Sequence, residues 1–239
     1  MPVAHSTPAY HYMPRADTNA TAEPLQFSSS YTSTTLTSII ACAVPMIALM
    51  FLAGISWVYR YSVQKPRPIN KASGYRLQRF APLFYILLVL TSLAELAIST
   101  WLVIQYNYQD NYPNLAALLA VRVLLFTSCW TIITASVASF LFIHPDWSRQ
   151  PISSIGSQAL WIFITWILWI LSAGLLNAAV PSLLVKRSCA NIVYCGQIRS
   201  LFALGVIQSL LLSCGMFVLM WLAWQSTRDI LRPVDTPTK

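Results

Sequence analysis

The sequence has 239 residues, of which 56% are hydrophobic and only 9% are charged, and its mean hydropathy is +0.60. A soluble globular domain carries roughly a quarter charged residues, so this composition excludes an ordinary soluble protein and indicates a membrane protein. The formal net charge of +8 does not indicate a nucleic-acid-binding protein, because the basic residues cluster beside apolar runs.

Five apolar runs are long enough to cross a membrane, because a hydrocarbon core of about 30 Å needs on the order of 20 helical residues. They cover residues 36–59, 81–105, 115–143, 157–183 and 201–224. The segments around them are too short to bury a core of their own. We therefore predict an all-α integral membrane protein whose transmembrane helices are the fold.

The chain opens with a polar segment, residues 1–35, which we predict to be a disordered outer tail. Asn-Ala-Thr at 19–21 is an acceptor for N-glycosylation at Asn19, which is used only on the lumenal or extracellular side. A chance occurrence of this common triplet is the alternative. The run at 36–59 is longer than the apolar region of a signal peptide, so we expect it to be a permanent first span.

The loop at 60–80 is strongly basic, whereas the loop at 107–114 has no basic residue. Because basic residues are retained on the cytoplasmic side, the 60–80 loop and the tail at 225–239 are predicted to be cytoplasmic and the 184–200 loop to lie outside. The loop residues are also predicted to contact anionic lipid headgroups, at about 1 kcal/mol each. A role in topology alone is the alternative. These residues are Arg60, Lys65, Arg67, Lys71, Arg76 and Arg79.

Glu95 and Arg122 are the only charged residues inside the predicted spans. At 1.5 Å per residue they lie about 15 Å and about 10 Å from the outer ends of two consecutive spans. We therefore predict an intramembrane ion pair, with Ser92 and Ser99 on the same helix face as Glu95. A pair that fixes helix packing is favoured over a proton relay or a headgroup site, because no other span offers a titratable partner.

Small residues in the later spans predict close helix packing. One face of the third span carries Ser128, Thr131, Ala135 and Ala138, and the fourth span has Gly174 and Ala178 four residues apart. Aromatic residues near the span ends are predicted to be interfacial anchors. They are Tyr106, Tyr108, Trp147, Tyr194, Trp221 and Trp224.

Cys189 and Cys195 lie in the predicted outer loop, and their placement predicts an intrachain disulfide. Metal binding is the weaker alternative, because that loop offers no His or carboxylate to complete a site. The sequence has no zinc-protease motif, no Gly-rich phosphate loop and no G-x-S-x-G nucleophile motif. We therefore predict a protein that is not an enzyme, with no cofactor and no metal.

Four stretches in one order resemble the fungal branch of the MARVEL-like four-span membrane proteins. They are SLAELAISTWLVIQYN (92–107) with NYPN after it, RVLLFTSCWT (122–131), ITWILWILSAG (164–174) and CANIVYCGQIRSLFAL (189–204), and the resemblance covers about residues 76–225. It implies an antiparallel four-helix transmembrane bundle at 81–224 with both bundle termini cytoplasmic and a cysteine-bearing outer loop. The span at 36–59 is an additional N-terminal transmembrane helix that the family pattern lacks.

The resemblance also implies a role in membrane apposition, lateral membrane organisation or vesicle traffic. The expected partners are the lipid bilayer, anionic headgroups on the cytoplasmic face, and a second copy of the chain or other membrane proteins. The expected location is the plasma membrane or an endomembrane. A small transporter or channel subunit that uses Glu95 and Arg122 is the alternative function.

Overall fold

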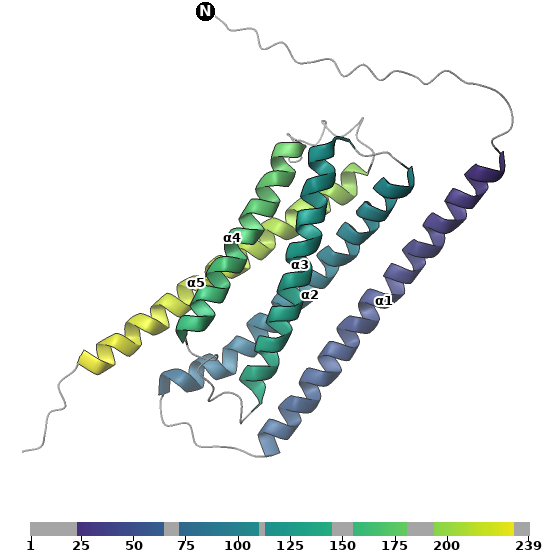
Figure 1. Ribbon diagram of the computed structural model, residues 1–239. Helices are drawn as coiled ribbons and strands as arrows, with labels where there is room; N and C mark the ends of the chain where they lie inside the picture. The colour runs from purple at the N-terminus through teal and green to yellow at the C-terminus, as the bar shows by residue number, and fades with distance from the viewer. Residues whose placement is uncertain (1–22, 65–71, 110–112, 145–154, 181–193, 232–239) are drawn as a thin grey trace, which may run out of the picture.

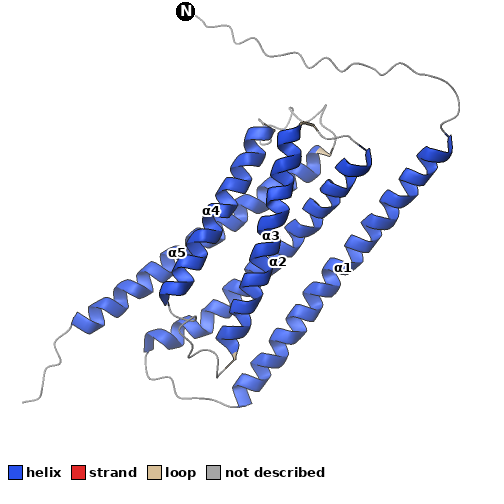
Figure 2. Ribbon diagram, viewed as in Figure 1, coloured by secondary structure: helices blue, strands red, loops and turns tan. Residues whose placement is uncertain are grey.

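The computed structural model describes residues 23–64, 72–109, 113–144, 155–180 and 194–231. Over these residues the protein forms five α-helices and no strand (Figures 1 and 2). All five helices are long and apolar enough to cross a membrane, which confirms the prediction of an all-α protein with five candidate spans. The helices are α1 (Glu23–Gln64), α2 (Ala72–Gln109), α3 (Leu115–Ile143), α4 (Ile155–Ala179) and α5 (Cys195–Leu231).

Helices α1, α2 and α5 begin six or more residues before the apolar runs, and α4 begins two residues before its run. Helix α1 begins at Glu23 inside the predicted disordered tail, α2 begins at Ala72 inside the predicted basic loop, and α5 begins at Cys195 inside the predicted outer loop. The helices extend beyond the predicted spans there, because apolar composition marks what lies in hydrocarbon and not where backbone hydrogen bonding stops. Only α3 has the predicted bounds.

Helix α3 has the predicted bounds because both of its ends are capped. The side chain of Asn114 accepts a hydrogen bond of 2.6 Å from the backbone N–H of Ala117, which satisfies one of the free donors at the helix start. The same side chain donates to the carbonyl of Ala179 at 2.8 Å. At the other end, the N–H of His144 donates to the carbonyl of Phe140. Asn114 therefore joins the start of α3 to the end of α4.

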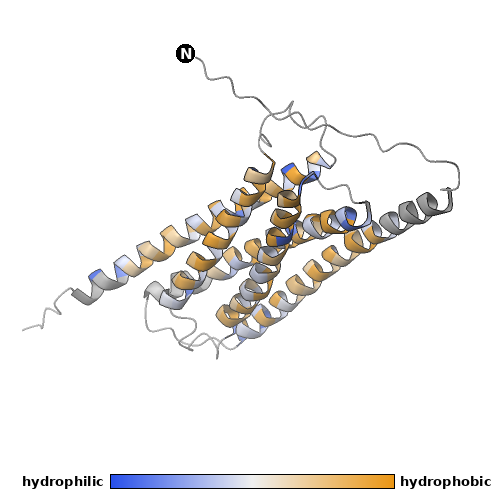
Figure 3. Cartoon of the chain, turned by 45° about the horizontal axis from the view of Figure 1, so that its top comes forward, coloured by the Kyte–Doolittle hydropathy of each residue, from blue (hydrophilic) through white to orange (hydrophobic). Residues whose placement is uncertain are grey.

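Helices α2 to α5 pack around one core. Helix α2 contacts α3 and α5, and α4 contacts the same two helices (Figure 1). Most residues of the helices are apolar (Figure 3), and large apolar side chains are exposed on all five helices, as expected where lipid replaces water. Large side chains with almost no exposed surface fill the core: Tyr106, Leu88, Leu102, Leu124, Trp169, Leu176, Ile198, Leu201 and Leu212.

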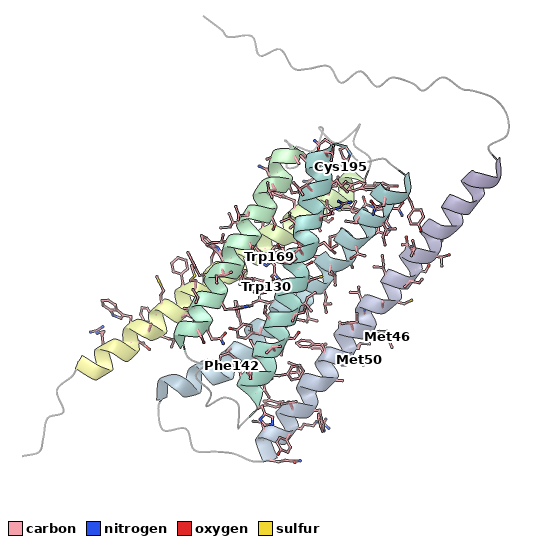
Figure 4. The ribbon with its side chains drawn as sticks, in the orientation of Figure 1. Met46, Met50, Trp130, Phe142, Trp169 and Cys195 are labelled. Carbon is pink, nitrogen blue, oxygen red and sulfur yellow. The ribbon has the colours of Figure 1, made fainter. Side chains whose placement is uncertain are left out.

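Helix α1 lies along the edge formed by α2 and α3 and buries little of itself. Only 6% of its most apolar stretch is buried, against 39% in α2 and in α3. Trp101 donates a 2.9 Å hydrogen bond to Thr37 near one end of the contact, and Phe51 packs edge-on against Phe140. Most of the α1 surface therefore faces outward, including the side chains of Met46 and Met50 (Figure 4).

The small-residue predictions have different outcomes in α3 and α4. Ser128, Thr131, Ala135 and Ala138 are all buried, so the predicted packing face of α3 is confirmed. Gly174 and Ala178 are exposed, so the predicted contact face of α4 is wrong. Helix α4 instead turns toward the core a face that includes Trp169, Ala173 and Leu176.

The predicted interfacial aromatic residues also differ in where the structure places them. Tyr108, Trp221 and Trp224 are exposed, as an anchor requires. Tyr106 is 1% exposed and belongs to the core, because it lies on the face of α2 that points toward the other helices. Tyr194 is half-buried against Trp101, and Trp147 lies outside the described residues.

Candidate functional site

Glu95 lies in the middle of α2 and has no exposed surface. Gly205 of α5 stands directly beside it: a Cβ atom added to that glycine would lie 3.5 Å from Oε1 of Glu95. The same added atom would lie 3.7 Å from Ala173 of α4 and 3.9 Å from Leu124 of α3. Residues of α2, α3, α4 and α5 therefore meet at Gly205, beside the buried carboxyl.

The predicted ion pair between Glu95 and Arg122 is wrong. Arg122 is exposed on α3, and neither carboxylate oxygen of Glu95 has a hydrogen-bond partner among the described residues. Arg122 precedes the core residue Leu124 by two positions, which is a rotation of about 200° around a helix. The depth of the two charges in the membrane suggested a pair, but rotation points the guanidinium away from the core.

Ser92 and Ser99, predicted on the same helix face as Glu95, are buried like it, but neither forms a hydrogen bond with the carboxyl. Ser99 donates to the carbonyl of Leu96 at 3.1 Å. Ser92 accepts a hydrogen bond from the amide of Gln208. The face shared with Glu95 is therefore polar without solvating the carboxyl.

Gln208 of α5 is the main polar link between α2 and α5, and it has no exposed surface. Its Nε2 donates to the carbonyl of Leu88 at 3.1 Å and to the hydroxyl of Ser92, and its Oε1 accepts from Thr91 at 2.8 Å. An amide nitrogen has two hydrogens, so both donors are used. Gln208 has no donor left for Glu95.

A second polar link joins α3 to α4. The hydroxyls of Thr127 and Ser172 lie 2.9 Å apart, and each also lies within hydrogen-bond distance of a carbonyl of its own helix. One turn further along α3, Thr131 accepts a 3.1 Å hydrogen bond from the indole N–H of Trp169, labelled in Figure 4. These hydroxyls are satisfied within the protein.

We call Thr91, Ser92, Glu95, Thr127, Ser172 and Gln208 the polar layer. Every member except Glu95 has hydrogen-bond partners in the structure, while both carboxylate oxygens of Glu95 are buried and unmatched. Buried polar groups are nearly always hydrogen-bonded, so this exception calls for an explanation. The unmatched carboxyl is the candidate functional group of the protein.

Sequence reasoning missed a second buried cluster between α2, α3 and α4. The hydroxyl of Tyr85 donates to the side-chain oxygen of Gln158. The ring of Tyr85 stacks on Phe142, with 5.7 Å between ring centroids, and lies 5.5 Å from Trp161. In the sequence, Tyr85 and Gln158 stand near the ends of two apolar runs. Sequence alone does not distinguish such residues from polar and aromatic residues at the membrane interface.

The basic residues predicted to contact lipid headgroups are placed only in part. Arg60 is exposed near the C-terminal end of α1, and Arg76 and Arg79 lie in the first turns of α2. Lys65, Arg67 and Lys71 lie outside the described residues, as does Asn19. The headgroup contact and the glycosylation therefore stay predictions.

The cysteines of the spans carry free thiols: Cys42, Cys129 and Cys214. Cys195 is not among these free thiols and is buried at the start of α5, labelled in Figure 4. Cys189 lies outside the described residues, so its pairing with Cys195 stays a prediction. The residue before Cys195, Tyr194, adopts a left-handed backbone conformation with φ of 61°.

In the part of the chain that the structure describes, no three side chains of His, Cys, Asp or Glu gather to hold a metal ion. The site thus consists of the polar layer and its unmatched carboxyl. The chain matches no protein-family model, no curated protein and no solved structure.

Proposed function

We propose that this protein is a non-enzymatic, multi-pass membrane protein that organises the membrane around it through lipid and helix–helix contacts. One observation carries the proposal: apart from Glu95, the polar layer satisfies itself, while large apolar side chains are exposed on all five helices. The protein therefore offers its surroundings mainly apolar helix surface. Such surface interacts with lipid tails and with other transmembrane helices.

An antiparallel four-helix bundle, with α1 as the additional helix, is part of this proposal. Contacts between α2 and α5 support it, because the α5 residue number rises as the α2 number falls. Glu95 faces Gly205, Thr91 bonds Gln208, and Phe84 lies on Gly215. The MARVEL-like resemblance at 76–225 concerns these same helices and is proposed with them.

The proposed partners follow from charge and from exposed surface. Anionic headgroups on the cytoplasmic face are the proposed partners of Arg60, Arg76 and Arg79, at the two ends of the α1–α2 connection. The exposed face of α1 is available to a second copy of the chain or to another membrane protein. The plasma membrane or an endomembrane is the proposed location.

Fluorescent tagging of the full chain tests the proposal. An organiser is expected to concentrate in patches or vesicles, and its loss should change membrane morphology while ion and solute fluxes stay the same. The tagged protein should restore the morphology when it is expressed again. A uniform distribution, together with unchanged morphology after loss, would contradict the proposal.

The buried carboxyl of Glu95 favours a second candidate, a small transporter or channel subunit. Arg122 is not proposed as the partner of Glu95 in that function, because it is exposed on the outside of α3. Liposomes that contain the purified protein distinguish the two functions. A flux that Glu95→Gln abolishes would support transport and overturn the organiser.

A further inference from the structure

Neither carboxylate oxygen of Glu95 has a hydrogen-bond partner among the described residues. Where Gly205 of α5 borders Oε1 of Glu95, the other neighbours are the apolar side chains of Leu124 from α3 and Ala173 from α4. The side-chain amide of Gln208 on α5 is committed to Leu88 and Ser92, and Arg122 of α3 is exposed.

An ionised carboxylate cannot be stable in this enclosure. Moving an isolated charge from water into a low-dielectric interior is strongly unfavourable, so a charged partner or a hydrogen-bond network must offset that cost. The structure provides neither for Glu95. A neutral carboxylic acid has no such cost, because its proton removes the charge.

We propose that Glu95 is a proton-binding site inside the bundle, which holds its proton while the helices are closed and exchanges it when α5 separates from α2 at Gly205. Gly205 is the proposed point of opening, because it borders Oε1 and places no side chain between the carboxyl and the α5 backbone. This inference goes beyond the proposed function, because proton binding requires neither flux nor a change in membrane morphology.

Labelling with dicyclohexylcarbodiimide tests the proposal on the full chain in liposomes. This apolar reagent reacts with neutral carboxylic acids: the acid proton moves to a carbodiimide nitrogen, and the carboxyl oxygen bonds to the central carbon. Glu95 is the only one of the seven acidic residues that lies in a candidate span. Peptide mass spectrometry therefore assigns the label without ambiguity.

We expect Glu95 labelling to change less than about twofold between pH values of about 5.5 and about 8, whereas labelling of a carboxyl in water falls about tenfold per pH unit above its usual range. A water-soluble carbodiimide should leave Glu95 unlabelled, because the closed bundle excludes it. Glu95→Gln should remove the label while keeping the thermal unfolding temperature, since the amide is neutral and of similar size.

Two alanine substitutions form a matched pair. Gly205→Ala adds a methyl in ordinary contact with Oε1 and should slow labelling several-fold with little change in stability. Gly174→Ala adds a methyl with nothing within 4 Å and should leave the labelling rate unchanged. Equal rates in the two variants would show that opening does not occur at Gly205 and would overturn that part of the proposal.

Four results on the unmodified protein would overturn proton binding. Labelling that falls with pH as in water would show an ionised carboxyl, and labelling by the water-soluble reagent would show a site open to water. An absence of labelling at every pH would show a carboxyl that does not exchange its proton. Slower labelling at about pH 8 in the presence of sodium ions would show a cation site instead. Because these results come from the wild-type chain, they do not depend on whether any variant folds.

Discussion

The ring of Phe84 in α2 lies directly on Gly215 of α5: a methyl group added at residue 215 would lie 2.6 Å from Cζ of that ring. A real Cβ atom cannot approach so closely, so the ring or one of the helices must move in Gly215→Ala. Overpacking of this kind costs about 1–3 kcal/mol in well-packed cores. We expect a lower thermal unfolding temperature in detergent, measured by intrinsic fluorescence.

The control is Gly174→Ala, which adds the same methyl group on α4 where nothing lies within 4 Å. It should leave the unfolding temperature unchanged. Adding Phe84→Leu to Gly215→Ala should recover part of the loss, because the smaller side chain vacates the space. Strictly additive losses in the double variant would show that the two residues do not touch.

A second prediction concerns Gln208. Replacing it with leucine removes its bonds to Thr91, Ser92 and the Leu88 carbonyl. Hydrogen bonds between membrane helices contribute about 0.6 kcal/mol each on average, so Gln208→Leu should destabilise the protein by about 1–2 kcal/mol. Asn177→Leu is the control, because Asn177 is exposed on α4. Equal unfolding temperatures for the two variants would contradict the role of Gln208 as the link between α2 and α5.

A third prediction separates Glu95 from Arg122. Because Arg122 is exposed and turned away from the carboxyl, Arg122→Leu should change stability by no more than about 0.5 kcal/mol. The double variant Glu95→Gln/Arg122→Leu should show the sum of the two single effects within about 0.5 kcal/mol. A larger coupling energy in a complete double-mutant cycle would show that Glu95 and Arg122 do interact.

A fourth prediction counts thiols. The chain has five cysteines, of which Cys42, Cys129 and Cys214 are free in the structure. If Cys189 and Cys195 form a disulfide, denatured protein should take up three maleimide groups without reductant and five with it. Closing so short a loop should contribute no more than about 3 kcal/mol. Five groups taken up without reductant would rule the disulfide out.

A fifth prediction concerns topology. Asn19 is expected on the lumenal or extracellular side and residues 60–79 on the cytoplasmic side. Glycosylated protein should migrate faster on a gel after Asn19→Gln, and protease added outside intact cells should spare the 60–79 loop. Cleavage of that loop would reverse the predicted orientation.

Hydropathy predicted the five helices well because lipid requires about 20 apolar residues for each span, whatever the neighbours are. It did not predict rotation, because spans that are apolar on all sides carry little information about which side faces inward. It therefore did not predict that Glu95 is buried while Arg122 is exposed. The small residues of α3 did indicate its inner face, since Ser128, Thr131, Ala135 and Ala138 are all buried.

The glycines show the same limit. Gly174 and Ala178 form a small-residue pattern, yet α4 turns them outward. Gly215 makes the close approach to Phe84, and Gly205, ten residues earlier, borders Glu95. What distinguishes them is the partner on α2, a carboxyl in one case and an aromatic ring in the other. A single helix sequence contains no information about that partner.

The peripheral attachment of α1 has a consequence for biosynthesis. Its aromatic and hydrogen-bond contacts go to Trp101, Phe140 and His144, and all of these precede α4 in the chain. Helix α1 can therefore dock on α2 and α3 while synthesis continues. The enclosure of Glu95 must wait for Ala173 and then for Gly205, so the carboxyl is sealed only when the last helix has been inserted.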